Sequence, residues 1–290
     1  MTVAVTAVTG QLGQEVVRAL LDLNTDQPIV GLARTPANAR GLGVEVRPGD
    51  YGDVQLLTAS LAGVSSLLLV SGNEDPRARI RQHRNVLEAA KTAGVGKVVF
   101  TSVQGAEAGT AFSPVIASCR QTESDLRGSG MDWAIGRNGI YIEPDLEAID
   151  DYQAAGEVTN CAGEARCGYA TRAELAYAYA HLLLDAKHDG RTYLLHGDPI
   201  TQAQLVEHLN DAFATDLRYR PVPVDTYRDD RIAALGEFMG TIIAGIYAGI
   251  RDGAHDHPSD YAAAAGRPHQ SWDDYFATVA TGTRPGGSRR

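Results

Sequence analysis

Residues 3–21 read VAVTAVTGQLGQEVVRALL, and they decide the fold of this 290-residue chain. The apolar run at 3–8 predicts a strand, and the glycines at 10 and 13 predict a tight turn after it. Apolar residues then recur at helical spacing, at Leu12, Val16, Val17, Leu20 and Leu21. A strand, a glycine turn and a helix in this order are typical of the first unit of a doubly wound α/β fold.

The same alternation continues through residue 140. We expect further strands at 28–33, 44–49, 65–71, 97–102 and 131–137, and helices at 53–61, 76–93 and 114–128. Several of these strands lack polar alternation, as expected when helices cover both faces of a sheet. Residues 1–140 therefore predict a Rossmann-type domain with a doubly wound parallel sheet and right-handed crossovers.

The regular alternation of strands and helices becomes weaker after residue 140. Residues 141–280 predict a smaller C-terminal α/β region that closes over the ligand edge and shapes a substrate cleft. We expect its helices at 172–186, 201–215 and most of 225–250, and its strands near 192–197 and 217–223. Residues 281–290 predict a disordered tail.

The composition excludes several classes of protein. With 26 basic and 36 acidic residues, the net charge of −10 argues against a nucleic-acid binder and against a protein of anionic membrane surfaces. Three cysteines build no disulfide framework, and no metal site is expected, although His255 and His257 are a weak candidate. The chain starts without a signal peptide, so we expect a cytoplasmic protein. The apolar stretch 239–250 is too short to cross a membrane and predicts a core or subunit-contact helix, and 242–250 suggests a homodimer.

The glycine turn has the composition of a phosphate loop. Its backbone N–H groups and the N-terminus of the following helix suit a pyrophosphate, and no charged side chain precedes Glu15. The first glycine position of the pattern G-x-x-G-x-x-G is Ala7 in this chain. Its methyl group could crowd a bound dinucleotide. A merely structural turn is the alternative. The predicted cofactor contacts here are Thr9, Gly10, Gln11, Leu12 and Gly13.

The residue after the second predicted strand sets the cofactor type. An NAD site usually has Asp or Glu there, whereas this chain has Arg34 in the sequence LART. A guanidinium suits a 2′-phosphate, so we expect NADP(H), with a solvated surface arginine as the alternative.

These motifs resemble the NmrA-like atypical short-chain dehydrogenases, in particular the branch of quinone reductases and triphenylmethane reductases. The matching segments cover nearly the whole chain in order, and each is short. They are TGQLG (9–13), LART (32–35), GDYGD (49–53), QHRNVLEAAKTAGV (82–95), FTS (100–102), TESDLRGSG (122–130), RNGIY (137–141), ATRAELA (170–176) and GRPHQSWDDYF (266–276).

The resemblance implies the fold predicted above and assigns further ligand contacts. Asp50 and Tyr51 would bracket the adenine of NADP(H). Four residues at the carboxyl ends of the fourth and fifth strands would line the ligand crevice: Ser71, Gly72, Thr101 and Ser102. The substrate pocket would lie at Asn138, Gly139 and Tyr141.

The departures from the family limit the chemistry. Short-chain dehydrogenases use a Tyr-x-x-x-Lys dyad, but aligned on Thr122-Glu123 those positions hold Val115 and Cys119. Ser102 and Asn85 would occupy the remaining polar positions of the catalytic set. A simple ketone would produce a localised alkoxide and would need a positioned acid, whereas a hydroquinone anion is delocalised.

Three side chains are candidates for a residual catalytic role. His83 is a candidate proton donor, with a structural helix histidine bonded to a neighbouring loop as the alternative. Ser102 is the second candidate. Tyr141 could hydrogen-bond a substrate oxygen or simply wall the pocket. A nucleophilic role for Cys119 is disfavoured, because the sequence offers it no activating base.

We therefore expect an enzyme that transfers hydride from NADPH to a quinone or a similar conjugated aromatic acceptor. Two alternatives stay open. One is a non-catalytic sensor of NADP(H) that regulates a partner protein. The other is a repurposed biosynthetic enzyme that cyclises, isomerises or reduces a polyketide-like intermediate.

Overall fold

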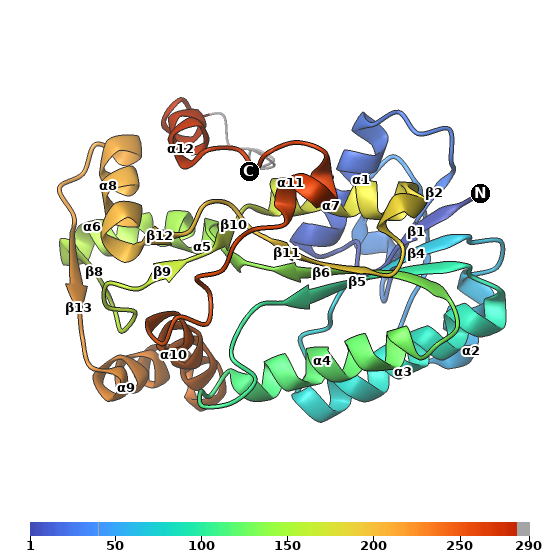
Figure 1. Cartoon of the computed structure of the whole chain (residues 1–290), viewed down its shortest axis with the longest axis horizontal. Helices are drawn as coiled ribbons and strands as arrows, with labels where there is room; N and C mark the ends of the chain where they lie inside the picture. Colours follow the sequence, from blue (N-terminus) through green and yellow to red (C-terminus); the bar gives the residue numbers. More distant parts are fainter. Residues whose placement is uncertain (40, 283–290) are drawn as a thin grey trace.

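The centre of the protein is a seven-stranded sheet with helices on both faces (Figure 1). The computed structural model describes residues 1–39 and 41–282. The strand order is β11-β6-β5-β4-β1-β2-β3, and every neighbouring pair is parallel. The predicted doubly wound parallel sheet is thereby confirmed. The strands are β1 (Val3–Val5), β2 (Ile29–Ala33), β3 (Glu45–Pro48), β4 (Ser66–Leu69), β5 (Lys97–Val103), β6 (Asp132–Asn138) and β11 (Arg191–Leu195).

Two layers of helices bury the sheet. One face carries α1 (Gln11–Asp22), α7 (Arg172–Leu184) and α11 (Tyr261–Ala265), and the other carries α2 (Val54–Ser60), α3 (Pro76–Ala93) and α4 (Ser113–Arg127) (Figure 1). Because both faces are covered, all four residues of β4 are buried, which explains the run of three leucines at 67–69.

The second region lies beyond the carboxyl ends of the strands, toward which the arrows of β5 and β6 point in Figure 1. Short strands and helices build it around its own apolar core. Its strands are β7 (Ile140–Tyr141), β8 (Glu157–Asn160), β9 (Arg166–Cys167), β10 (Tyr169–Ala170), β12 (Ile200–Thr201) and β13 (Arg218–Pro221). Its helices are α5 (Glu143–Glu147), α6 (Ile149–Ala155), α8 (Gln202–Phe213), α9 (Val224–Leu235), α10 (Glu237–Arg251) and α12 (Trp272–Ala280).

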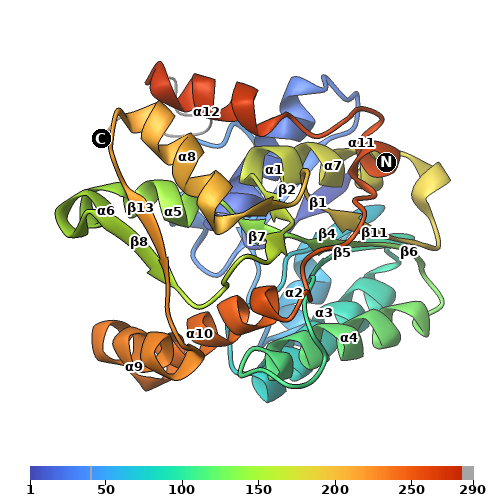
Figure 2. The ribbon, with the colours of Figure 1, turned by 60° about the vertical axis from the view of Figure 1, so that its left-hand side comes forward.

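The helical stretch expected at 225–250 is two helices that pack against each other (Figure 2). Gly236 separates α9 from α10, and its φ of 80° is one that glycine adopts without strain. A Cβ at Gly245 would stand 2.4 Å from the backbone of Phe112, so α10 packs closely on the loop before α4. One face of the apolar segment is thus buried against the body of the protein.

The chain returns to the first region after leaving it. Strand β11 extends the central sheet beside β6, and α7 and α11 cover its face. The division at residue 140 stays a prediction, but residues 172–195 and 261–265 belong to the sheet layers. The predicted tail at 281–290 falls almost entirely on residues 283–290, which lie outside the described residues. No helix in the described part of the chain is long and apolar enough to span a membrane.

Candidate active site

The predicted phosphate loop connects β1 to α1 with its backbone open to solvent. Helix α1 begins at Gln11, and its N-cap Gly10 has no side chain to satisfy the first N–H groups of the helix. Thr9, Gly10 and Gln11 are exposed, and the first turn contains no acidic residue. Free N–H groups and the positive end of the helix dipole therefore meet at a surface that suits a phosphate.

Ala7 and Gly13 shape this loop. Ala7 has a φ of 52°, in the left-handed region that favours glycine, and its carbonyl accepts a hydrogen bond from Gly10 N at 2.9 Å. A Cβ at Gly13 would stand 2.6 Å from that carbonyl oxygen, so only glycine lets α1 pack this closely on the loop. The turn thus keeps the backbone path of a glycine-rich loop, although its first glycine position is alanine.

Arg34 directly follows β2 and is exposed. No hydrogen bond or ion pair joins its side chain to another of the described residues. A guanidinium that is free at the end of the second strand fits a ribose 2′-phosphate.

The two predicted adenine contacts differ in their surroundings. Asp50 is exposed, and its side chain accepts a hydrogen bond from Gly52 N at 2.8 Å. The Tyr51 hydroxyl points inward, where it contacts the Thr6 hydroxyl and donates to the Val70 carbonyl at 2.8 Å. Burial raises the pKa of the Tyr51 phenol well above its usual value. The hydroxyl is therefore committed to the protein, and adenine stacking on the ring stays a prediction.

The ends of β4 and β5 meet at the crevice where a doubly wound sheet binds its ligand. Ser71 N donates to Thr101 Oγ1 at 2.8 Å, which links the two strand ends. Gly72 N donates to His83 Nε2 at 3.1 Å, and His83 Nδ1 lies 2.9 Å from Thr122 Oγ1.

Both nitrogens of His83 are therefore in use. Because Nε2 accepts from a backbone N–H, the ring is neutral and carries its proton on Nδ1. Burial, together with the charge of Arg79, lowers the pKa of His83 to about 3. These contacts fit the alternative of a structural histidine that holds the loop after β4, and they leave no proton for a substrate.

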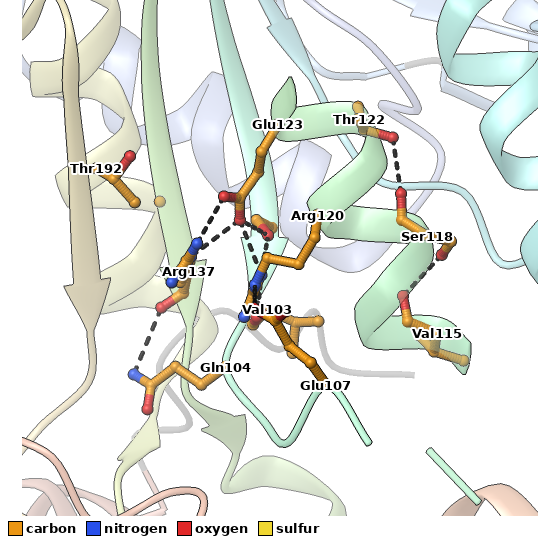
Figure 3. A network of polar contacts seen from close by, with 12 residues as sticks. Val103, Gln104, Glu107, Val115, Ser118, Arg120, Thr122, Glu123, Arg137 and Thr192 are labelled. Carbon is orange, nitrogen blue, oxygen red and sulfur yellow. Dashed lines mark hydrogen bonds and ion pairs between the residues drawn. The ribbon is translucent and has the colours of Figure 1, made fainter. Parts of the chain in front are cut away.

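An ionic network centred on Glu123 lies beneath the crevice (Figure 3), and Ser102 belongs to it. Its hydroxyl donates to Glu123 Oε1 at 2.7 Å. Glu123 is fully buried and pairs with Arg120 at 2.8 Å, with Arg127 at 3.1 Å and with Arg137 at 2.7 Å. Burial alone would raise the pKa of the Glu123 carboxyl, but hydrogen bonds from Arg137 and Ser102 hold it below its usual value. Ser102 thus helps to fix α4 on the sheet, and its hydroxyl proton is already donated.

The predicted substrate side is a chain of hydrogen bonds. Tyr179 Oη lies 2.6 Å from Asn138 Oδ1, and Asn138 Nδ2 donates to Tyr141 Oη at 3.4 Å. The Tyr141 proton remains free to hydrogen-bond a ligand, and burial raises the pKa of that phenol to about 12. Gly139 has a packing role, because a Cβ there would stand 2.2 Å from the Gly168 carbonyl oxygen.

Comparison with known proteins agrees with this geometry. Residues 8–186 match a family model described as NAD(P)H-binding. The chain belongs to the NAD(P)H-binding family. It is 37% identical over 222 residues to quinone oxidoreductase 2 of Escherichia coli, which covers 75% of this chain and 77% of that protein.

Solved structures show the same fold in family members. A crystal structure of the E. coli NADPH-dependent quinone oxidoreductase with NADPH has a TM-score of 0.88 and 31% identity, covering 96% of this chain and 99% of that one. The triphenylmethane reductase of Citrobacter sp., complexed with NADP(H), has a TM-score of 0.86 and 30% identity, covering 96% and 100%. The resemblance stated from the sequence is thereby confirmed.

The remaining groups with possible reactivity are the cysteines, potential metal ligands and His255. The three cysteines are free and buried, and burial raises the pKa of each thiol. Among residues 1–39 and 41–282, no group of three His, Cys, Asp or Glu side chains could hold a metal ion. His255 is buried, and its pKa falls to about 4 because burial disfavours the charged ring.

Neither Glu123 nor Arg79 was predicted from the sequence as a functional residue. Arg120 and Arg127 stand three and four residues from Glu123 on α4, a spacing that signals ion pairs, but the partner Arg137 comes from β6. Arg79 and His83 share the buried stripe of α3 with Val86, which is visible as a helical period in the sequence.

Proposed function

We propose that the protein reduces quinones or similar conjugated aromatic acceptors with NADPH. The observation that carries the proposal is the exposed Arg34, which pairs with no other described residue, together with the uncapped N-terminus of α1. Together they offer one site for a pyrophosphate and a second for a 2′-phosphate. The quinone and triphenylmethane reductases to which the chain is similar support the acceptor class.

The residues present fit NADP(H). The Gly10 cap and the free N–H groups of α1 would hold the pyrophosphate, and the Gly13 contact keeps the helix close enough to do so. Ser71, Gly72 and Thr101 would flank the reacting end at the tips of β4 and β5. When bound, the reduced nicotinamide supplies a hydride.

The acceptor must be one whose reduction does not depend on a strong proton donor from the protein. His83 and Ser102 have donated their protons to protein groups, and Tyr141 keeps its own because its pKa is about 12. A localised alkoxide would need a better donor, whereas a hydroquinone anion can be protonated by water. Tyr141 and Asn138 would orient the acceptor by hydrogen bonding, and proximity would supply most of the rate.

The variant Arg34→Ala tests the cofactor site. Loss of a charge-assisted pair should weaken NADPH binding by about 10- to 100-fold, while NADH binding stays unchanged. Isothermal titration with both cofactors measures this, and Arg218→Ala, which removes another exposed arginine, is the control. Equal losses for NADPH and NADH would contradict the role of Arg34. A wild-type protein that binds NADPH tightly but oxidises it with no quinone would contradict the proposed activity.

We further propose a cytoplasmic homodimer. The three free cysteines support a reducing compartment. Leu235, Phe238 and Met239 are exposed at the corner of α9 and α10 and would supply an apolar contact. Light scattering on Phe238→Glu should report a monomer where the wild type reports a dimer.

A further inference from the structure

Arg79 is a buried cation without a counter-charge. It lies on α3, its side of the helix faces the interior, and the residue is 7% exposed. Its Nη1 donates weakly to Ser118 Oγ at 3.4 Å, and its buried Nε has no hydrogen-bond partner. None of the ion pairs within the described part of the chain includes Arg79.

Three other arginines near the crevice have a carboxylate partner, unlike Arg79. Arg120, Arg127 and Arg137 all pair with Glu123, and their side chains are more exposed than Arg79. An uncompensated buried charge is costly, and a fold retains one only where something other than stability requires it. The missing partner of Arg79 is therefore expected to be an anion that the protein binds.

The surroundings of Arg79 locate that anion. Arg79 lies one helical turn before His83 on the buried face of α3, and His83 Nε2 accepts a hydrogen bond from Gly72 N at the end of β4. Ser71 N in turn donates to Thr101 Oγ1 at the ends of β4 and β5. The guanidinium is thus one helical turn from a side chain that contacts the crevice in which the acceptor would be reduced.

Cys119 is the position that the family resemblance assigns to the lysine of the dyad. That lysine would place a cation on α4, whereas here Arg79 comes from α3 and contacts Ser118, the residue before that position. The two helices pack side by side, so a long side chain on one reaches the inward face of the other (Figure 1).

We propose that Arg79 supplies the positive charge that stabilises the oxyanion formed on the reduced acceptor. This rests on the proposed function. The transferred hydride carries two electrons to the acceptor, which becomes a hydroquinone monoanion, and one proton from water completes the hydroquinone. Arg79 donates no proton, because a guanidinium stays charged throughout.

The test measures anion binding without turnover. 4-Nitrophenol serves as the probe, since its anion absorbs visible light and carries its charge on a delocalised ring like a hydroquinone anion. The protein saturated with NADP⁺ is titrated with it across pH. The wild type should lower the apparent pKa of the bound phenol by about one unit, and Arg79→Met should abolish that shift.

Two variants control the charge. Arg79→Lys keeps it and should retain most of the shift, and Arg77→Met removes an exposed arginine from the same helix and should leave the shift intact. If the phenol titrates alike in wild type and Arg79→Met, the proposal is wrong. It is also wrong if Arg79→Met weakens NADP⁺ binding 100-fold, since the guanidinium would then belong to the cofactor.

The stability of Arg79→Met distinguishes a functional role of the guanidinium from a structural one. A methionine in place of an unpaired buried cation should leave the urea midpoint equal to or above that of the wild type. A large loss of stability, or failure to fold, would show that the guanidinium is structural and would overturn the proposal. The phenol titration stands apart from the proposed activity, because it needs no hydride transfer.

Discussion

The phosphate loop and the buried polar cluster of His83, Ser102 and Glu123 differ in how their polar atoms are partnered. We call this buried cluster the floor. In the loop, Gly10 gives α1 no side-chain cap, and the exposed guanidinium of Arg34 forms no hydrogen bond or ion pair with the residues that the structure describes. In the floor, Glu123, Ser102 and His83 are buried and bonded to neighbours. Exposed polar groups cost little when they are free and can therefore bind ligands, whereas buried groups must be paired and therefore hold shape.

Removing the central carboxylate of the floor should have the largest effect. Glu123→Gln leaves three arginines without their shared counter-charge and should lower the free energy of unfolding by about 3–5 kcal/mol. Urea unfolding measures it. Glu107→Gln, which removes an exposed partner of Arg120, should cost less than about 1 kcal/mol. Similar losses for both variants would mean that the floor is no more sensitive than the surface.

His83 offers a pH test of the same floor. Its folded pKa of about 3 lies below the unfolded value of about 6.5, so the unfolded chain binds the extra proton between these values. Wild-type stability should therefore fall as the pH drops from about 6.5 toward 3, and His83→Gln should flatten part of that slope. At pH 8 the variant should lose only about 1–2 kcal/mol, the worth of its hydrogen bonds.

Turnover of the same variant distinguishes the two roles of His83. A structural histidine predicts that the pH profile of NADPH oxidation keeps its shape in His83→Gln. Loss of a basic or acidic limb from that profile would restore His83 as a proton donor.

The smallest effect is expected in the loop. Ala7→Gly relieves a left-handed backbone at φ 52° but adds freedom to the unfolded chain, so the gain in stability should be about 1 kcal/mol or less. NADPH affinity should stay equal or rise slightly, as calorimetry would show. A clear loss of affinity would mean that the alanine methyl contributes to the cofactor surface.

The sequence predicted the first region closely, because strand and helix periods are local. The helix expected at 76–93 is α3 to the residue, and the strand expected at 97–102 is β5 with one residue more. The second region was harder to predict, since β7, β9, β10 and β12 are two-residue strands whose pairing depends on distant partners. The split at Gly236 follows from its positive φ, which no periodicity reveals.

The places of the candidate site residues in the fold were predictable where a single backbone segment forms the site, while their contacts with a ligand stay predictions. The phosphate loop and Arg34 follow from their places after β1 and β2. The engagement of His83 and Ser102 did not, because Thr122 and Glu123 approach them from another helix. Arg79 was hidden for the same reason, since the absence of a partner can be seen only when all neighbours are in place.

The late arrival of β11 has a consequence for synthesis on the ribosome. Strand β6 is complete at Asn138, but the strand that covers its edge ends only at Leu195. At translation rates of about 5–20 residues per second, the apolar edge at Ala134 and Ile135 waits roughly 3–11 seconds for its neighbour. During that interval the edge of β6 is unpaired, and an unpaired strand edge can pair with other chains.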